Sequence, residues 1–152
     1  TWRERHRATV VPDRYPGEGP LAGIQAGLEA AVGDRAWVLG CDQPLLSARA
    51  AALLLDRLTA ADAQAALPAL QGAVQPLHAI YRRNECLRAA GEQLASGERR
   101  LMALLDLVRW IAVDEREFAE RGIPLHFAAD ADTPEQHAAI ETLDREANEA
   151  AD

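Results

Sequence analysis

The sequence predicts an α/β domain with a mostly parallel sheet, in the three-layer, Rossmann-like arrangement. Short apolar segments alternate with segments of helical spacing along most of the chain. One apolar segment, residues 36–41, is followed directly by Asp42-Gln43-Pro44, as is typical of a buried parallel strand. Because open α/β sheets bind ligands at the carboxyl ends of their strands, Asp42 occupies a position where a ligand is expected.

The composition indicates one globular domain. The chain has 152 residues, of which 49% are apolar, enough to form a core. The net charge is -8, all sixteen basic residues are arginine, and no basic tail is present, which argues against nucleic acid as a partner. No apolar run is long enough for a membrane span, and Cys41 and Cys86 have no metal-ligand spacing. We therefore expect a cytoplasmic protein without a membrane partner.

Local signals predict the elements of the first half of the chain. Pro20 suits the first position of a helix that ends near Gly33. Ser47 is a suitable N-cap for a second helix, whose apolar side carries three leucines, Leu53, Leu54 and Leu58. The predicted strands are residues 8–11, 36–41, 65–70 and 77–82, with a turn at Gln71-Gly72 before the last.

The second half continues the alternation. Asn84 is expected to cap a helix that stops at Ser96-Gly97, and Thr133-Pro134 to begin the last helix. Between them the predicted elements are a short helical piece at 100–107, an edge strand at 108–113, helical turns at 114–121 and a brief strand at 126–128. We expect three apolar side chains to lie in the core: Trp37, Cys41 and Trp110.

A glycine-rich loop before the strand of residues 36–41 predicts an anion site. Residues 17–24 read Gly-Glu-Gly-Pro-Leu-Ala-Gly-Ile and lead into the helix at Pro20. The start of a helix offers free N–H groups and the positive end of its dipole, so Gly19, Pro20, Leu21 and Gly23 are candidate anion-binding residues. A shared divalent cation explains why a carboxylate, Asp42, would belong to the same site.

Five motifs together resemble one family. The segment 19–24 and Cys41-Asp42-Gln43-Pro44 look like the corresponding motifs of the molybdenum cofactor guanylyltransferases, the MobA-like nucleotidyltransferases. Residues 76–81, 97–102 and 130–135 resemble three further family motifs, in the same order along the chain. The resemblance implies a nucleotidyltransferase fold and the transfer of GMP from GTP to the molybdopterin cofactor, with release of pyrophosphate. It also implies molybdoenzymes or their chaperones as possible later partners.

The resemblance also implies roles for single residues. Asp42 matches the family's magnesium-binding aspartate, which makes Mg²⁺ the expected cofactor and Asp42 the expected catalytic and metal-binding residue. Asp13 matches an aspartate that contacts the nucleotide, although an ordinary Pro-Asp turn explains it equally well. For Asp42 the plainer alternative is an aspartate that caps a turn at a strand end.

Several other residues are candidate ligands of the cofactor or of phosphate. Arg99 and Arg100 suit phosphate because a guanidinium matches its oxygens, although a solvated helix start explains them as well. His78 and Arg82 lie on one face of a predicted strand and could reach the pterin, or His78 could be a core histidine. Asp130 and Asp132 alternate in the same way, or Asp132 caps the last helix.

The sequence also departs from the family pattern. The family's first strand and its phosphate-binding glycine loop with a lysine are not found, so residues 1–152 are interpreted as a single MobA-like domain that is truncated at its N-terminus. We expect such a chain to bind GTP weakly. Asp130 and Asp132 stand where guanylyltransferases often have asparagines, which leaves a CTP-dependent cytidylyltransferase, or one acting on another phosphorylated acceptor, as an alternative. A non-catalytic module that carries the cofactor is a second alternative.

Overall fold

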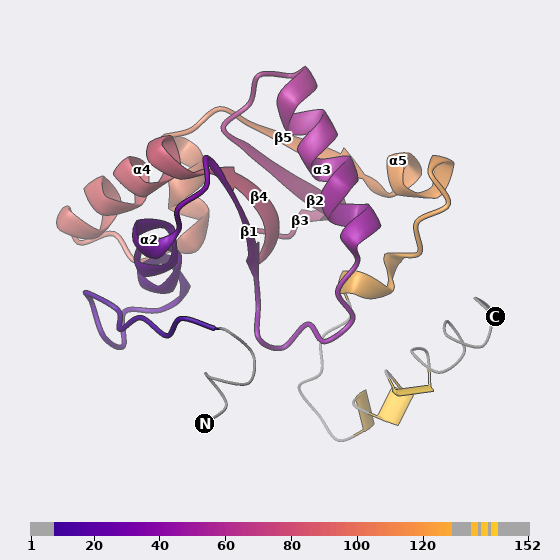
Figure 1. The fold of residues 1–152 in the computed structure, drawn as a ribbon, viewed down its shortest axis with the longest axis horizontal. Helices are drawn as coiled ribbons and strands as arrows, with labels where there is room; N and C mark the ends of the chain where they lie inside the picture. Colours follow the sequence, from indigo (N-terminus) through magenta and orange to yellow (C-terminus); the bar gives the residue numbers. More distant parts are fainter. Residues whose placement is uncertain (1–7, 129–134, 137, 140, 143–152) are drawn as a thin grey trace. The chain divides into compact units, whose positions relative to one another are not determined.

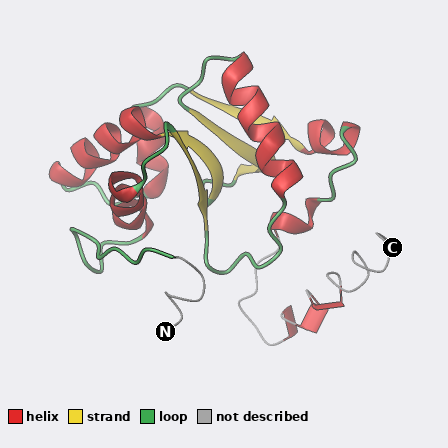
Figure 2. Cartoon of the chain, viewed as in Figure 1, coloured by secondary structure: helices red, strands yellow, loops and turns green. Residues whose placement is uncertain are grey.

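The computed structural model describes residues 8–128 together with 135, 136, 138, 139, 141 and 142. The chain forms two compact units, Thr1–Ala36 with Tyr81–Arg109 and Trp37–Ile80 with Trp110–Asp152. Helices and strands alternate along it, which confirms the predicted α/β class (Figure 2). The chain passes between the units three times: within β1 (Arg35–Leu39), within β4 (His78–Arg82) and directly before Trp110. Each unit is described by itself below.

The first unit is built from helices α2 (Pro20–Ala30) and α4 (Arg83–Ala95) and the 3₁₀ helix η1 (Leu101–Asp106), which pack against one another. Pro20 occupies the first turn of α2, as predicted. The N-cap of α4 is Arg82, so the predicted cap at Asn84 is wrong: Asn84 lies inside the first turn. The predicted stop is confirmed, because Gly97 follows Ser96 with φ 89°, a left-handed conformation that suits glycine.

The second unit contains most of a five-stranded sheet. Its order is β1-β4-β2-β3, and β5 also pairs with β2 (Figure 1). The remaining strands are β2 (Ala65–Leu70), β3 (Ala73–Val74) and β5 (Trp110–Asp114). β2 and β5 run parallel, with Ala65 opposite Trp110, whereas β2 and β3 form an antiparallel hairpin. The hairpin turns at Gln71 and Gly72, whose φ angles of 52° and 78° are both positive, as a two-residue type I′ turn requires.

The sheet is mixed, so the prediction of a mostly parallel sheet is only partly confirmed. The N–H of Gly40, after β1, donates to the carbonyl of Leu77, before β4, at 2.8 Å. The N–H of Arg83, after β4, donates to the carbonyl of Asp34, before β1, also at 2.8 Å. The end of each strand therefore meets the start of the other, and β1 and β4 run antiparallel.

One side of this sheet is covered by α3 (Ala48–Ala60), which packs on β2 and β5. The Ser47 hydroxyl accepts the N–H of Ala50 at 3.1 Å, which confirms the predicted N-cap. Two short helices complete the unit, α5 (Glu115–Glu120) and the 3₁₀ helix η2 (Leu125–Ala128). The core of this unit is formed by Ala50, Leu53, Leu54, Leu58, Ala66, Leu70, Ile80, Val113, Phe118, Ile123 and Phe127.

Three predictions of burial are wrong. Cys41 is exposed because β1 has already ended at Leu39, and Trp110 is 39% exposed because it begins β5. Trp37, by contrast, is partly buried and packs against the core. β1 is half-buried rather than fully buried, since it is the first strand in the sheet order.

Two predicted strands are not formed. Residues 8–11 form no strand, and residues 126–128 belong to the 3₁₀ helix η2. The predicted helix start at Thr133-Pro134 lies outside the described residues. No helix in the described part of the chain is long and apolar enough to cross a membrane.

Candidate functional site

In the first unit the glycine-rich loop leads directly into α2. Gly19 is the N-cap, with φ 83° and ψ -169°, a conformation that glycine adopts far more easily than any other residue. Gly19 has no side chain to cap α2, Pro20 has no N–H, and the N–H of Ala22 donates to the carbonyl of Gly19 at 3.2 Å. Leu21 and Ala22 are fully buried, backbone included, whereas Gly17 and Gly19 are exposed. The backbone that a ligand can reach is therefore that of the two loop glycines.

Gly23 lies one turn into α2, on the exposed side of the helix. No atom of the described residues would lie within 4 Å of a Cβ placed at Gly23. Packing within the described structure therefore does not explain the missing side chain. The open space in front of Gly23 is compatible with a ligand that approaches the helix closely.

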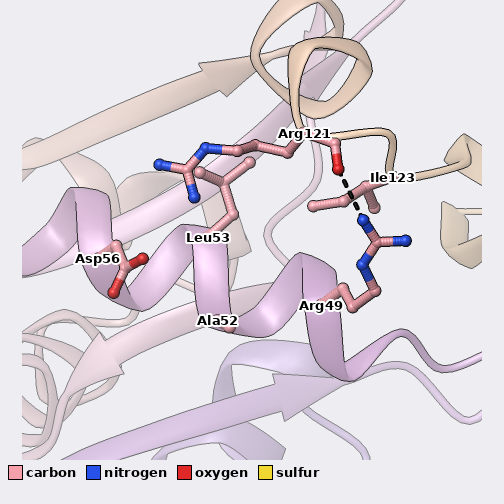
Figure 3. A pocket seen from close by; sticks show the side chains of 6 residues that line it. All are labelled: Arg49, Ala52, Leu53, Asp56, Arg121 and Ile123. Carbon is pink, nitrogen blue, oxygen red and sulfur yellow. Dashed lines mark hydrogen bonds between the residues drawn. The ribbon is translucent and has the colours of Figure 1, made fainter.

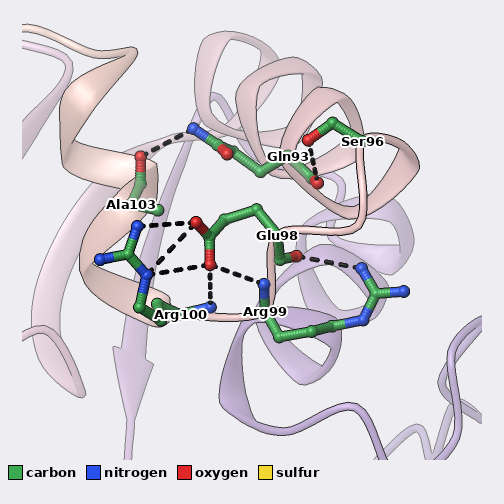
Figure 4. Close-up of polar contacts among 6 residues, drawn as sticks. All are labelled: Gln93, Ser96, Glu98, Arg99, Arg100 and Ala103. Atoms are coloured by element: carbon green, nitrogen blue, oxygen red, sulfur yellow. Dashed lines mark hydrogen bonds and ion pairs between the residues drawn. The ribbon is translucent and has the colours of Figure 1, made fainter.

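The two candidate arginines of this unit already have carboxylate partners. Arg99 pairs through Nε with Glu18 of the glycine loop, and its guanidinium lies 5.5 Å from the centre of the Tyr15 ring. Arg100 pairs with Glu98 at 2.7 Å, and Glu98 also accepts the backbone N–H groups of both arginines (Figure 4). These bonds, above all the one from the Arg100 side chain, lower the pKa of Glu98 to about 2. The paired carboxylates offset the charge of both arginines, which weakens their attraction for a phosphate.

In the second unit, Asp42 follows the end of β1 as predicted. It is exposed, and its carboxylate makes no hydrogen bond or ion pair with a described residue. Gly40 gives this carboxylate room: a Cβ at Gly40 would lie 2.5 Å from Oδ1 of Asp42. The role of Gly40 was not predicted, although a glycine two residues before the candidate ligand was a possible signal.

The described residues contain no group of three or more histidine, cysteine, aspartate or glutamate side chains that could hold a metal. A single free carboxylate nevertheless fits Mg²⁺, which is commonly bound by one or two carboxylates together with phosphate oxygens and water. Asp42 is therefore suited to the proposed metal only if a phosphate-bearing ligand completes the coordination. Asp13, the other candidate carboxylate, is exposed and lies in the loop region of the first unit.

His78 is a core residue. It is fully buried between the rings of Trp37, at 5.5 Å, and Phe127, at 4.6 Å, and neither ring nitrogen has a hydrogen-bond partner among the described residues. Burial lowers the pKa of its imidazole from the usual 6.5 to about 4. Of the two interpretations of His78, the structure supports the core histidine. Arg82 ends β4 and is partly buried, and Asp130 and Asp132 lie outside the described residues.

A pocket of about 260 Å³ lies elsewhere in the second unit, between α3 and the turn after α5. The Arg49 guanidinium points away from Asp56 and donates to the carbonyls of Arg121, at 2.6 Å, and Gly122, at 3.1 Å (Figure 3). Arg49 thus fastens this turn to α3. None of the candidate site residues lines the pocket.

The structure therefore brings the glycine loop and Arg99 together in the first unit, and it places Asp42 at a strand end in the second. The family model of the MobA-like NTP transferase domain matches residues 1–115. The chain belongs to this family.

Two curated relatives of this MobA-like chain have the same name. It is 32% identical over 127 residues to a probable molybdenum cofactor guanylyltransferase of Natronomonas pharaonis, covering 84% of the chain and 61% of that relative. It is 41% identical over 106 residues to one of Bacillus subtilis, covering 68% of the chain and 52% of the relative. The chain thus spans only part of the length of these relatives.

A solved structure agrees with the fold. The crystal structure of molybdopterin-guanine dinucleotide biosynthesis protein A from Archaeoglobus fulgidus superposes with a TM-score of 0.79 at 19% identity, covering 95% of this chain and 72% of the other. At this identity the likeness establishes the shared fold. The predicted family and α/β fold are confirmed.

Proposed function

We propose that this MobA-like chain takes part in the transfer of GMP from GTP to the molybdopterin cofactor, with release of pyrophosphate. The observation that supports it best is the exposed carboxylate of Asp42 after the end of β1, which has no partner among the described residues and lies inside the segment that matches the family. The names of the curated relatives support the choice of reaction.

In this proposal the metal ligand is Asp42. Mg²⁺ bound there would neutralise the charge that builds up on the phosphates as pyrophosphate leaves. The exposed Asp42 side chain supplies an unpaired carboxylate for this purpose, and the absence of a Cβ at Gly40 leaves space for its position.

The nucleotide would be held by the start of α2. The exposed backbone of Gly17 and Gly19 would contact phosphate oxygens, and the bare face at Gly23 would let the nucleotide approach the helix. Pro20 favours this arrangement because it occupies a first-turn position without needing an N–H partner. Asp13, exposed before the loop, is proposed to contact the nucleotide.

The test is Asp42→Asn, assayed by pyrophosphate release from GTP in the presence of molybdopterin cofactor and Mg²⁺. We expect a loss of about 100-fold or more, since the substitution removes the charge that holds the metal. Asp56→Asn, an exposed aspartate on α3 in the same unit, is the matched control and should keep wild-type activity. Wild-type turnover by the Asp42 variant would contradict the assignment.

The choice of nucleotide is tested in the same assay. GTP should support faster pyrophosphate release than CTP at equal concentration. A faster reaction with CTP would identify the chain as a CTP-dependent cytidylyltransferase. It would not contradict the proposed role of Asp42.

A further inference from the structure

The loop before α2 has little backbone support of its own. Residues 14–19 form neither helix nor strand, and the backbone bond within the loop runs from Glu18 N–H to the carbonyl of Tyr15 at 3.2 Å. Gly17 and Gly19 flank Glu18, and both have positive φ angles, 78° and 83°. Because neither glycine has a side chain, Glu18 is the residue of the segment 17–19 that can form a side-chain contact with another part of the unit.

The holding contact comes from the segment after α4. Arg99 pairs through Nε with the Glu18 carboxylate, although the two residues are 81 positions apart in the sequence. Its Nη1 donates to the carbonyls of Leu94, at 2.8 Å, and Glu98, at 3.0 Å. The same guanidinium lies over the Tyr15 ring, so it touches the loop at a second residue.

This geometry differs from that of an ordinary surface ion pair. Isolated exposed pairs contribute little because two long side chains must be ordered for one contact. Arg99 is only 34% exposed, and its planar guanidinium is already oriented by two backbone carbonyls and one aromatic ring. The loop is therefore clamped by a side chain that is fixed independently of it.

We propose that Arg99 and Glu18 are positioning residues, which hold the loop of residues 15–19 in the shape that lets the start of α2 receive the nucleotide. The proposal rests on the proposed function only for the identity of the ligand. It assigns Arg99 to the loop rather than to a phosphate group. The neighbouring Arg100 makes no such link, since it is paired with Glu98 two positions before it.

The first experiment does not depend on activity. Amide hydrogen exchange of Glu18 and Gly19 is compared in the wild type, Arg99→Gln and Glu18→Gln. We expect exchange to accelerate at least about fivefold in both variants, the loss expected for a charge-assisted contact of modest strength. Arg88→Gln removes the i,i+4 pair of Arg88 with Glu92 on α4 of the same unit and should leave these rates unchanged. Unchanged rates in Arg99→Gln would overturn the clamp.

The second experiment separates positioning from phosphate binding. If Arg99 were a phosphate ligand held back by Glu18, Glu18→Gln would release it and tighten GTP binding. The clamp predicts the opposite: Glu18→Gln and Arg99→Gln should each raise KM for GTP about fivefold or more, with kcat within about twofold of the wild type. Arg99→Lys should have a KM for GTP between those of the wild type and Arg99→Gln, because an ammonium group cannot make all the contacts of the guanidinium.

The reversed pair completes the test. Glu18→Arg combined with Arg99→Glu should have a lower KM than Glu18→Arg alone or Arg99→Glu alone, since opposite charges face each other again. It should not reach the wild-type KM, because a carboxylate at position 99 cannot donate to the carbonyls of Leu94 and Glu98. Tighter GTP binding in Glu18→Gln would overturn the positioning role. Should the wild type bind no GTP, the proposed function fails, and the exchange experiment still decides whether the clamp exists.

Discussion

The two units hold their candidate site residues by different means. In the first, the glycine loop is clamped by ion pairs near the surface, Arg99 with Glu18 and Arg14 with Glu29. In the second, Asp42 follows a strand of a sheet whose core is packed by leucine and phenylalanine side chains. Ion pairs near the surface weaken as salt rises, whereas apolar packing is not screened by salt. The loop of the first unit is therefore held by polar contacts that depend on ionic strength, and the strand end of the second by a core that does not.

The core of the second unit provides the largest expected effect. Phe118 is fully buried, with its ring 5.0 Å from that of Phe127. Phe118→Ala should lower the free energy of unfolding by about 3–5 kcal/mol, because it removes apolar contact and leaves a cavity. Denaturant unfolding measures this, and Leu125→Ala, at a residue 37% exposed, is the control with a small expected effect. A loss below about 1 kcal/mol for Phe118→Ala would mean that this core does not hold the strand end as described above.

The same core contains a buried histidine that makes the second unit sensitive to acid. The folded protein keeps the His78 pKa near 4, whereas the unfolded chain has the usual 6.5. The unfolded state therefore binds more protons between these values, and stability should fall as the pH decreases from 6.5 to 4, by about 3 kcal/mol in total. Above pH 6.5 this contribution is fully present.

His78→Phe tests that assignment. The variant should lose the part of the pH dependence between 6.5 and 4 that belongs to His78, because no imidazole remains to be protonated. His126→Gln, at an exposed histidine of η2, is the control and should retain it. An unchanged pH profile of the unfolding free energy in His78→Phe would show that other groups cause the acid sensitivity.

Substitutions of two glycines of the first unit, Gly23 and Gly19, should change the melting temperature in opposite directions. Gly23→Leu should raise KM for GTP about tenfold, equivalent to about 1.4 kcal/mol, because its side chain fills the open face of α2. Its melting temperature should stay the same or rise, since leucine favours a helix more than glycine and a Cβ at this exposed position meets no described atom within 4 Å. Gly19→Ala should lower the melting temperature, because φ is 83° there. A lower melting temperature with an unchanged KM in Gly23→Leu would make Gly23 a structural residue.

The smallest expected effect concerns Gly40. Gly40→Ala should push the Asp42 carboxylate into another rotamer, at a cost of about 1 kcal/mol. The Mg²⁺ concentration for half-maximal activity should rise about fivefold, while the free energy of unfolding changes little. Gly33→Ala is a control, since the Cβ added there would meet Arg35 O at 3.4 Å, close to ordinary contact. An equal Mg²⁺ requirement in the wild type and Gly40→Ala would show that the Asp42 side chain relaxes freely.

The sequence by itself determined those features that depend on a few neighbouring residues. The Ser47 cap, Pro20 at the start of α2, the stop at Gly97 and the strand at residues 65–70 were all predicted correctly. The family motifs are equally local, since each is a run of a few adjacent residues, and the position of Asp42 after a strand followed from the apolar run before it. The capping hydrogen bond of Ser47 and the positive φ angle at Gly97 act within one turn, so no knowledge of distant residues is needed for them.

Only the tertiary structure decided which distant residues meet. The antiparallel pairing of β1 with β4, the exposure of Cys41 and Trp110 and the burial of His78 between two aromatic rings depend on which elements pack together. Arg99 is the clearest case. Its guanidinium group suits a phosphate, but the fold pairs it with Glu18, which lies 81 positions away in the sequence. Such pairings are selected by the packing of the whole unit, because the side chain that satisfies a charge can come from any part of the chain.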